Sequence, residues 1–395
     1  MKIINAHVID GTGANPIKDA VLVFDDRLSE IGTAADQAET HEPDTLDAGG
    51  RTVIPGLINA HSHIVLDSNN PDTLGAIGAE PPAVTAIRAA QRARRMLVAG
   101  ITTARDVGGR DYIDLAIRDL IKSGEIPGPR LYCAGKLITM TGGQGWVIGR
   151  ECDGEDEVRK GVREQLKAGA DLIKMMATGG VLTPGVEPGS SQLNEAELRA
   201  GIVEAHKANR RVSTHAQGLD GIKAAIRAGV DTVEHGIFLD DEAVTMMVEN
   251  DVVFVPTLAA AYQLVNAGPE RGIPQFVMDK MNKLNEAHQK SFQLAWKAGV
   301  TLAAGNDGGT PFNPQEDLAT EIRLMIEAGV PALVAIRAAT WNSAKALGLE
   351  DEVGTLKTGK KADLVVLDGN PLTDPGALSQ VWCVIQDGKV VYRAK

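Results

Sequence analysis

The middle of the chain, roughly residues 51–347, repeats a unit in which a helix-like stretch ends at Ala-Gly and a short apolar run follows. Four copies stand out: VAGITTARD, KAGADLIKM, RAGVDTVEH and KAGVTLAAG. Their glycines, Gly100, Gly169, Gly229 and Gly299, stand where a helix C-terminus favours a residue that readily adopts positive φ. The pattern predicts helices that end at these glycines and strands that begin directly after them.

The apolar runs of this region supply eight predicted strands, most of them separated by helix-length segments. These strands lie around Val53, Ile101, Leu131, Ile173, Val212, Val233, Phe254 and Leu302. Eight βα units are typical of an α/β fold of the (β/α)₈ TIM barrel type. A doubly wound open sheet also alternates strands and helices, but no GxGxxG phosphate-binding loop follows the first strand here.

The two ends of the chain have a different texture, because short alternating strands are broken by Gly and Asp turns. The segments are MKIINAHVIDGTG, AVLVFDDRLSEIG, KKADLVVLDG and VWCVIQDGKVVYR. Such segments predict hairpins. We therefore expect one small composite β-sandwich domain from residues 1–52 plus 350–395, with the catalytic barrel, residues 53–349, inserted between its halves.

The composition of the chain counts against some classes of binding partner, nucleic acids and membranes among them. The 395 residues carry a net charge of −12 with both signs interspersed, so no basic stripe predicts nucleic-acid binding. Cys133, Cys152 and Cys383 are too few for a disulfide framework or a cysteine-based zinc site. Neither a secretory signal nor a membrane-spanning run is recognisable. These observations favour a cytoplasmic protein that acts on a small molecule, without a membrane partner. A homo-oligomer is expected because barrels of this kind commonly assemble into larger oligomers.

Four of the eight histidines fall at the ends of predicted barrel strands, which is where barrel active sites lie. His61 and His63 are two residues apart, so both imidazoles project to the same side of a strand. His215 and His235 end consecutive strands, about 4.8 Å apart, which suits two ligands of one ion. An isolated pair is more often accidental, but together they predict two metal sites. The remaining four, His7, His41, His206 and His288, are assigned to surface or packing roles.

Lys174 and Asp307 complete the polar set at the strand ends. Lys174 lies in an otherwise apolar strand, where an unpaired ammonium is costly to bury. One possibility is a salt bridge with Asp307 or a glutamate; the other is a neutral amine that reacts with carbon dioxide to give an anionic carbamate able to bridge two cations. Asp307, inside GNDGG, is either a turn residue or a metal ligand and proton acceptor.

Taken as a whole, the chain resembles the amidohydrolase superfamily, in the branch with Xaa-Pro dipeptidase-like, arginine or lysine carboxypeptidase-like and imidazolonepropionase-like metal-dependent hydrolases. The motifs are GLINAHSH, ADLIKMMATGG, STHAQG, RAGVDTVEHG, VPTL, AGNDGG and GTLKTGKKADLVVLD. The resemblance implies two divalent ions, usually zinc, bridged by carboxylated Lys174 and a hydroxide. It also implies His61, His63 and Asp307 on one ion, and His215 and His235 on the other. Asp307 would relay protons during hydrolysis of an amide-like C–N bond of a dipeptide or N-acyl amino acid.

The loops depart from that branch at two positions. Relatives that act on dipeptides often carry TGGH after strand three and a His or Tyr two residues after the strand-five histidine, where this chain has Gln144 and Gln217. Glutamine can donate to a carboxylate but brings no charge. Arg150 is a candidate partner for a substrate carboxylate, and Trp146 and Tyr262 are candidate apolar walls.

Three alternative functions stay open on the sequence alone. The first is a mononuclear deaminase or cyclic-amide hydrolase of the same superfamily, against which Lys174 counts. The second is a lactone or phosphoester hydrolase, since the same chemistry attacks those centres. The third is a catalytically silent barrel scaffold, against which the presence of all six expected metal-site residues counts.

Overall fold

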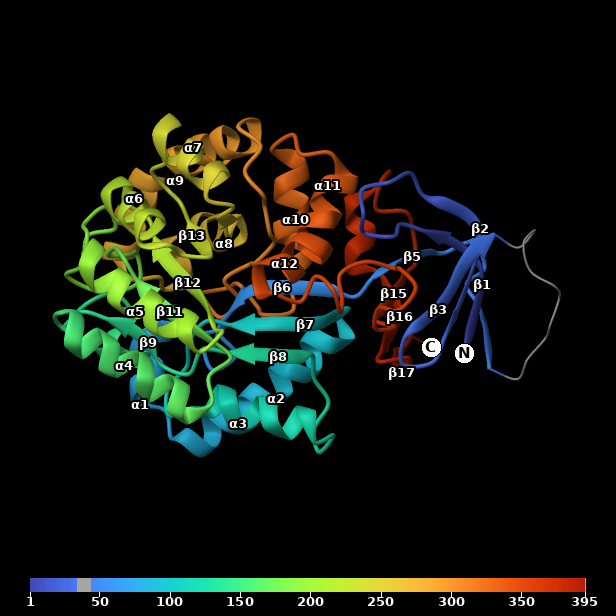
Figure 1. Ribbon diagram of the computed structural model, residues 1–395, viewed down its shortest axis with the longest axis horizontal. Coiled ribbons are helices and arrows are strands. Elements are labelled where there is room, and N and C mark those ends of the chain that lie inside the picture. The colour runs from blue at the N-terminus through green and yellow to red at the C-terminus, as the bar shows by residue number, and fades with distance from the viewer. Residues whose placement is uncertain (34–43, 395) are drawn as a thin grey trace.

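The structure is a computed structural model that describes residues 1–33 and 44–394. It has two parts, a barrel covered by helices and a β-sheet that contains both chain termini (Figure 1). The polypeptide leaves the sheet to build the barrel and returns to the sheet afterwards.

Parallel strands at the centre of the barrel confirm the predicted α/β fold. They are β6 (Leu57–Ser62), β7 (Ile101–Asp106), β8 (Arg130–Cys133), β9 (Leu137–Thr139), β10 (Gly149–Glu151), β11 (Leu172–Met176), β12 (Arg211–Ala216), β13 (Thr232–His235) and β14 (Val253–Val255). Hydrogen bonding orders them as β6-β7-β8 and as β10-β9-β11-β12-β13-β14. Leu302 forms a parallel bridge with Phe254, and the Ala60 N–H donates to the Ala304 carbonyl, so the segment after Val300 lies between β14 and β6, in the place of the eighth predicted strand.

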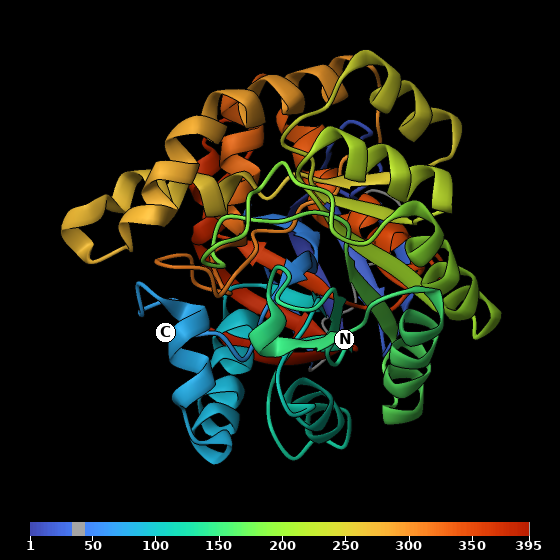
Figure 2. The same ribbon diagram turned by 90° about the vertical axis from the view of Figure 1, so that its left-hand side faces the viewer.

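Helices surround these strands, as Figure 2 shows. They are α1 (Thr73–Ala79), α2 (Pro82–Val98), α3 (Ile113–Lys122), α4 (Glu155–Ala168), α5 (Glu195–Lys207), α6 (Leu219–Ala228), α7 (Asp241–Glu249), α8 (Leu258–Ala267), α9 (Gln275–Lys297), α10 (Leu318–Glu327), α11 (Ala332–Arg337) and α12 (Ser343–Leu347). The four Ala-Gly sites behave as predicted, since their glycines have φ between 80° and 96° directly after α2, α4, α6 and α9. None of the described helices is both long enough and apolar enough to cross a membrane.

The terminal sheet combines strands from both ends of the chain, as predicted. Its members are β1 (Lys2–Val8), β2 (Ile17–Phe24), β3 (Leu28–Thr33), β4 (Thr45–Asp47), β5 (Thr52–Pro55), β15 (Leu364–Leu367), β16 (Val381–Gln386) and β17 (Lys389–Arg393). Hydrogen bonds join them into one continuous mixed sheet in the order β17-β16-β15-β5-β1-β2-β3, with β4 beside β1. Ile3, Leu22, Phe24, Leu364 and Ile385 are among the residues of its own hydrophobic core.

The strand predicted around Val53 lies in a different sheet from the one expected. Val53 belongs to β5, which pairs with β1 and β15 in the terminal sheet. The first barrel strand is β6, which begins only two residues after Pro55 and carries the HSH motif at its end. The two strands form one apolar run in the sequence, and periodicity alone does not reveal that Gly56 separates them.

Candidate active site

At the end of β6, two histidines converge with an aspartate from the eighth strand position. The Nε2 atoms of His61 and His63 lie 3.3 and 3.5 Å from the Oδ1 atom of Asp307. All three residues are buried, and their ligand atoms lie within 4.8 Å of one another. Two imidazoles and a carboxylate in this arrangement are a typical donor set for a divalent transition-metal ion.

The rings of His61 and His63 are held by their other nitrogen atoms. The His61 Nδ1 donates to the Glu234 carboxylate at 2.7 Å, and the His63 Nδ1 donates to the Gly108 carbonyl at 2.8 Å. Such contacts fix the tautomer and orientation of a metal-binding histidine. They leave each Nε2 lone pair directed toward Asp307.

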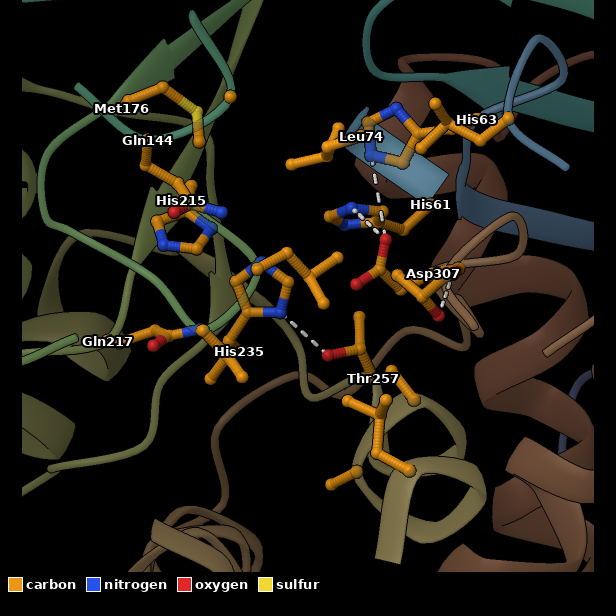
Figure 3. Close-up of a pocket in the computed structure, with 18 of the residues that line it drawn as sticks. His61, His63, Leu74, Gln144, Met176, His215, Gln217, His235, Thr257 and Asp307 are labelled. Atoms are coloured by element: carbon orange, nitrogen blue, oxygen red, sulfur yellow. Dashed lines mark hydrogen bonds and ion pairs between the residues drawn. The ribbon is translucent and has the colours of Figure 1, made fainter. Parts of the chain in front are cut away.

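His215, His235 and Lys174 lie on the neighbouring strands β12, β13 and β11, and line the same pocket. The rings of His215 and His235 have centroids 4.5 Å apart, and the His235 centroid is 5.1 Å from that of His61 (Figure 3). The His215 Nε2 donates to the Gly179 carbonyl at 3.0 Å, and the His235 Nδ1 is hydrogen-bonded to Thr257 at 2.8 Å. The six residues predicted as metal ligands are therefore brought together at the pocket floor.

Burial dominates the protonation of this floor. It lowers the pKa of His63 to about 4 and that of His215 to about 3, so both imidazoles are neutral near pH 7. Burial also lowers the pKa of Lys174 to about 8, and its Nζ is a buried nitrogen with no hydrogen-bond partner. For Asp307, burial alone would raise the pKa, but His61, His63 and Lys174 together hold it well below the usual value. The floor thus offers neutral imidazoles at His63 and His215 and an ionised carboxylate at Asp307.

The backbone is strained at three points of this floor. His235, Thr257 and Asp307 all have positive φ, at 69°, 53° and 56°. Non-glycine residues adopt this region rarely, and such strain tends to persist at functional sites. Gly305 allows the close approach of the eighth strand, because a Cβ there would lie 2.6 Å from backbone and side-chain atoms of His61. A glycine at this position therefore lets the backbone before Asp307 approach the site closely.

Beneath the floor lies a buried ion pair that sequence reasoning missed. Arg105 on β7 donates to Glu234 on β13 at 2.7 Å, and both side chains are inaccessible to solvent or nearly so. The other Glu234 oxygen accepts from His61, so Arg105 acts on a metal ligand through one carboxylate. Burial would raise the pKa of Glu234, but Arg105 and His61 keep it well below the usual value. The sequence signal for this pair is a charged residue within each of two predicted strands: Arg105 in ITTARD and Glu234 in DTVEH.

A cavity of about 90 Å³ opens above the floor. Gln144 and Gln217, two of the residues predicted to contact substrate, line it. Two hydrophobic clusters supply most of its wall: Leu74 and Met176 belong to the main barrel core, whereas Leu264 belongs to a separate cluster between α8 and α9. Apolar pockets with a few convergent polar groups commonly bind small molecules.

The other three predicted contacts lie outside the lining of this pocket. Trp146 is 48% exposed. Tyr262 lines a neighbouring cavity between α8, α9 and α10. Arg150 forms ion pairs with Glu157 and Glu164 at 2.9 and 2.8 Å, so its guanidinium is already neutralised by the protein.

One of the histidines assigned to packing or surface roles, His288, lies next to the active site. His288 on α9 is buried, with its Nε2 donating to the Pro256 carbonyl at 2.8 Å, and it also lines the pocket near His235. It therefore packs as expected, but against the active site. His41 lies outside the described residues.

A lysine from α9 organises the loop after β11. The Lys280 ammonium is buried and donates to the carbonyls of Gly180, Val181, Thr183 and Val186. This loop supplies Val181 to the pocket wall and the Gly179 carbonyl to His215. Lys280 thus connects a wall of the pocket with its floor.

Comparison with known proteins places this geometry in a family. The model of the amidohydrolase family matches residues 52–391. The chain belongs to the amidohydrolase family. It is 32% identical to ochratoxinase from Aspergillus niger, with 95% of this chain and 84% of the relative covered.

Solved amidohydrolase structures agree closely with the fold. A Xaa-Pro dipeptidase with bound methionine matches with a TM-score of 0.90 and 31% identity over 100% of this chain and 99% of that one. A prolidase complexed with N-methylphosphonate-L-proline matches with a TM-score of 0.90 and 32% identity over 100% and 99%. As an amidohydrolase, the chain is a metal-dependent hydrolase of small molecules with a His61, His63 and Asp307 metal site.

Proposed function

We propose that this amidohydrolase hydrolyses an amide-like C–N bond, of the kind found in dipeptides and N-acyl amino acids, at a site for two divalent ions, with zinc as the preferred metal. The observation that carries the proposal is the convergence of four histidines, Lys174 and Asp307 on one pocket floor. His61, His63 and Asp307 would hold one ion, and His215 and His235 the other.

The position of Lys174 is an argument for a second metal ion. Its amine lines the pocket together with all four histidines, and Nζ has no hydrogen-bond partner. A buried ammonium without a partner is costly, whereas a carbamate on this nitrogen would offer two oxygens to two cations. We therefore propose that Lys174 is carboxylated in the active enzyme.

The chemistry divides between the metals and the protein. Bound divalent ions supply Lewis acidity, which makes water a stronger nucleophile near neutral pH and polarises the scissile carbonyl. Asp307 is placed to accept a proton from the attacking water at Oδ1 and to return it to the departing nitrogen. The water oxygen bonds to the carbonyl carbon, the C–N bond breaks, and the products are a carboxylic acid and an amine.

The groups that are hydrogen-bonded to the metal-binding histidines, together with the pocket walls, prepare this reaction. Arg105 and Glu234 hold His61, while Gly179 and Thr257 hold His215 and His235, so the ligands need little reorganisation. Among the described lining residues, Asp307 is the only carboxylate. The α-ammonium group of a free dipeptide would therefore find no carboxylate partner in the pocket other than the metal ligand Asp307. For this reason N-acyl compounds, which lack that group, rank ahead of free dipeptides as substrates.

The test is a screen of purified, zinc-loaded protein against dipeptides, N-acyl amino acids, lactones and phosphoesters. We expect hydrolysis of amides ahead of the other classes, with two ions bound per active chain. Full activity with one ion per chain and with Lys174→Ala would instead establish a single-metal enzyme. No hydrolysis of any class would indicate a scaffold without catalysis.

If Lys174 is carboxylated, the reactivation of metal-free protein should depend on pH, because only the neutral amine reacts with carbon dioxide. With a pKa of about 8 in the metal-free protein, Lys174 is mostly protonated at pH 7, and its neutral fraction falls about tenfold for each unit below that pKa. At a fixed concentration of dissolved carbon dioxide, the rate at which metal-free protein regains activity with zinc should therefore rise about tenfold from pH 6 to pH 7 and level off above pH 8. A rate independent of pH over this range would contradict carboxylation.

A further inference from the structure

The charged side chains around the pocket are already occupied by protein partners. Lys280 donates to backbone carbonyls, Arg150 pairs with two glutamates, and Arg105 pairs with Glu234. Among the described residues that line the pocket there is no arginine, and Lys174 is the only lysine and belongs to the floor. A carboxylate on the substrate would therefore meet no cationic side chain in the walls.

The polar groups that remain in the walls are two neutral amides. Gln144 and Gln217 are 7% and 5% exposed, and the Oε1 atom of each is buried without a hydrogen-bond partner. Their backbones are fixed, since the Gln144 N–H donates to Gln192 and the Gln217 N–H donates to Thr178. Figure 3 shows both side chains beside His215. Buried polar atoms without partners at a pocket wall indicate groups that a ligand satisfies.

The shape of the apolar wall adds a second constraint. Leu74, Leu137 and Met176 come from one hydrophobic cluster, whereas Val181 and Leu264 come from another. In Figure 3, Leu74 lies between Met176 and His63, with His215 and His235 below. Residues of both clusters line the pocket, so a substrate bound at the floor can make apolar contacts with each cluster.

We propose that the substrate is an uncharged secondary amide with an apolar group on each side of the C–N bond, whose polar atoms are hydrogen-bonded by Gln144 and Gln217. The inference rests on the proposed amide hydrolysis and narrows its substrates to amides whose amine part lacks a carboxylate, in contrast to dipeptides and N-acyl amino acids, whose amine part carries one. Burying an unpaired charge is costly, whereas a neutral hydrogen bond to a buried glutamine is favourable.

The decisive experiment compares two substrates that differ only in charge, N-benzoylphenethylamine and N-benzoyl-L-phenylalanine, with the zinc-loaded protein. The first lacks the carboxylate of the second and is otherwise its counterpart. We expect kcat/KM to be at least tenfold higher for the uncharged compound. Equal values, or a preference for N-benzoylphenylalanine, would overturn the inference while leaving the proposed amide hydrolysis intact. Hydrolysis of no amide at all would instead remove the proposed function.

A variant tests whether the glutamines set this preference. Gln217→Arg places a cation beside His215, so kcat/KM for N-benzoylphenylalanine should rise relative to that for N-benzoylphenethylamine by at least tenfold. The control is Gln91→Arg on the exposed face of α2, which adds the same charge far from the pocket and should leave the ratio unchanged. A folded Gln217→Arg enzyme with an unchanged ratio would contradict the role given to this residue. If that variant does not fold, the wild-type ratio alone decides.

Discussion

The floor and the walls of the pocket differ in where their residues come from and in how they are held. The floor consists of side chains on the ends of barrel strands, and each of its imidazoles has one nitrogen fixed by a carboxylate, a carbonyl or a hydroxyl group. Much of the wall consists of aliphatic side chains from α1, α8 and the loop after β11. These residues are held by packing.

This difference separates the two functional properties of the enzyme. Strand ends occur at defined positions in a barrel, so the floor can keep one arrangement of ligands while helices and loops around it vary. We infer that the floor determines which type of bond is broken and that the walls determine which molecule is accepted. Substitutions in the two regions should therefore affect different kinetic constants.

The largest effect is expected at the floor, for Lys174→Met. Loss of the bridging group proposed for Lys174 should lower kcat by roughly a thousandfold or more, equivalent to about 4 kcal/mol of activation free energy. Metal analysis should show fewer than two ions per chain. Lys290→Met, on the exposed surface of α9, is the matched control and should retain full activity. If Lys174→Met kept both ions and wild-type kcat, the floor would not work as proposed.

Glu234→Gln tests the buried Arg105–Glu234 ion pair that holds His61. It removes the partner of buried Arg105, so the free energy of unfolding should fall by about 3–5 kcal/mol. It also weakens the hold on His61, which should cost about 10- to 100-fold in metal affinity or activity.

The double variant Arg105→Met with Glu234→Gln separates these two effects. Stability, measured by denaturant unfolding, should recover, while metal affinity should not. Recovery of both would mean that the ion pair supports the fold alone.

The same division explains how much the sequence could predict. The barrel and the convergence of the six floor residues followed from Ala-Gly helix ends and from polar residues at strand ends. Arg105 and Glu234 were missed because their pairing joins strands distant in the sequence. Arg150 was chosen as a free cation, yet it pairs with Glu157 and Glu164, which only the position of α4 brings within reach. Contacts between loops and helices carry no comparable period in the sequence.

Lys280→Met tests the connection between wall and floor, because the loop that Lys280 holds touches both. Its four carbonyl partners would lose their donor, so stability should fall by about 1–3 kcal/mol. If the loop serves mainly as a wall, KM should rise about tenfold while kcat changes less than about threefold. A fall in kcat at constant KM would show that the loop acts through Gly179 on His215 instead.

The smallest effect is expected for Arg150→Ala, which removes a charge near the pocket but outside its lining. The side chain is about one quarter exposed, so its two ion pairs should contribute at most about 1 kcal/mol to stability. Because the guanidinium is already bound by Glu157 and Glu164, kcat/KM for both charged and uncharged amides should change by less than about twofold. A selective rise in KM for N-acyl amino acids would show that Arg150 leaves its glutamates to bind a carboxylate. The region around the pocket would then recognise a charged substrate, which contradicts the proposal that the substrate is uncharged.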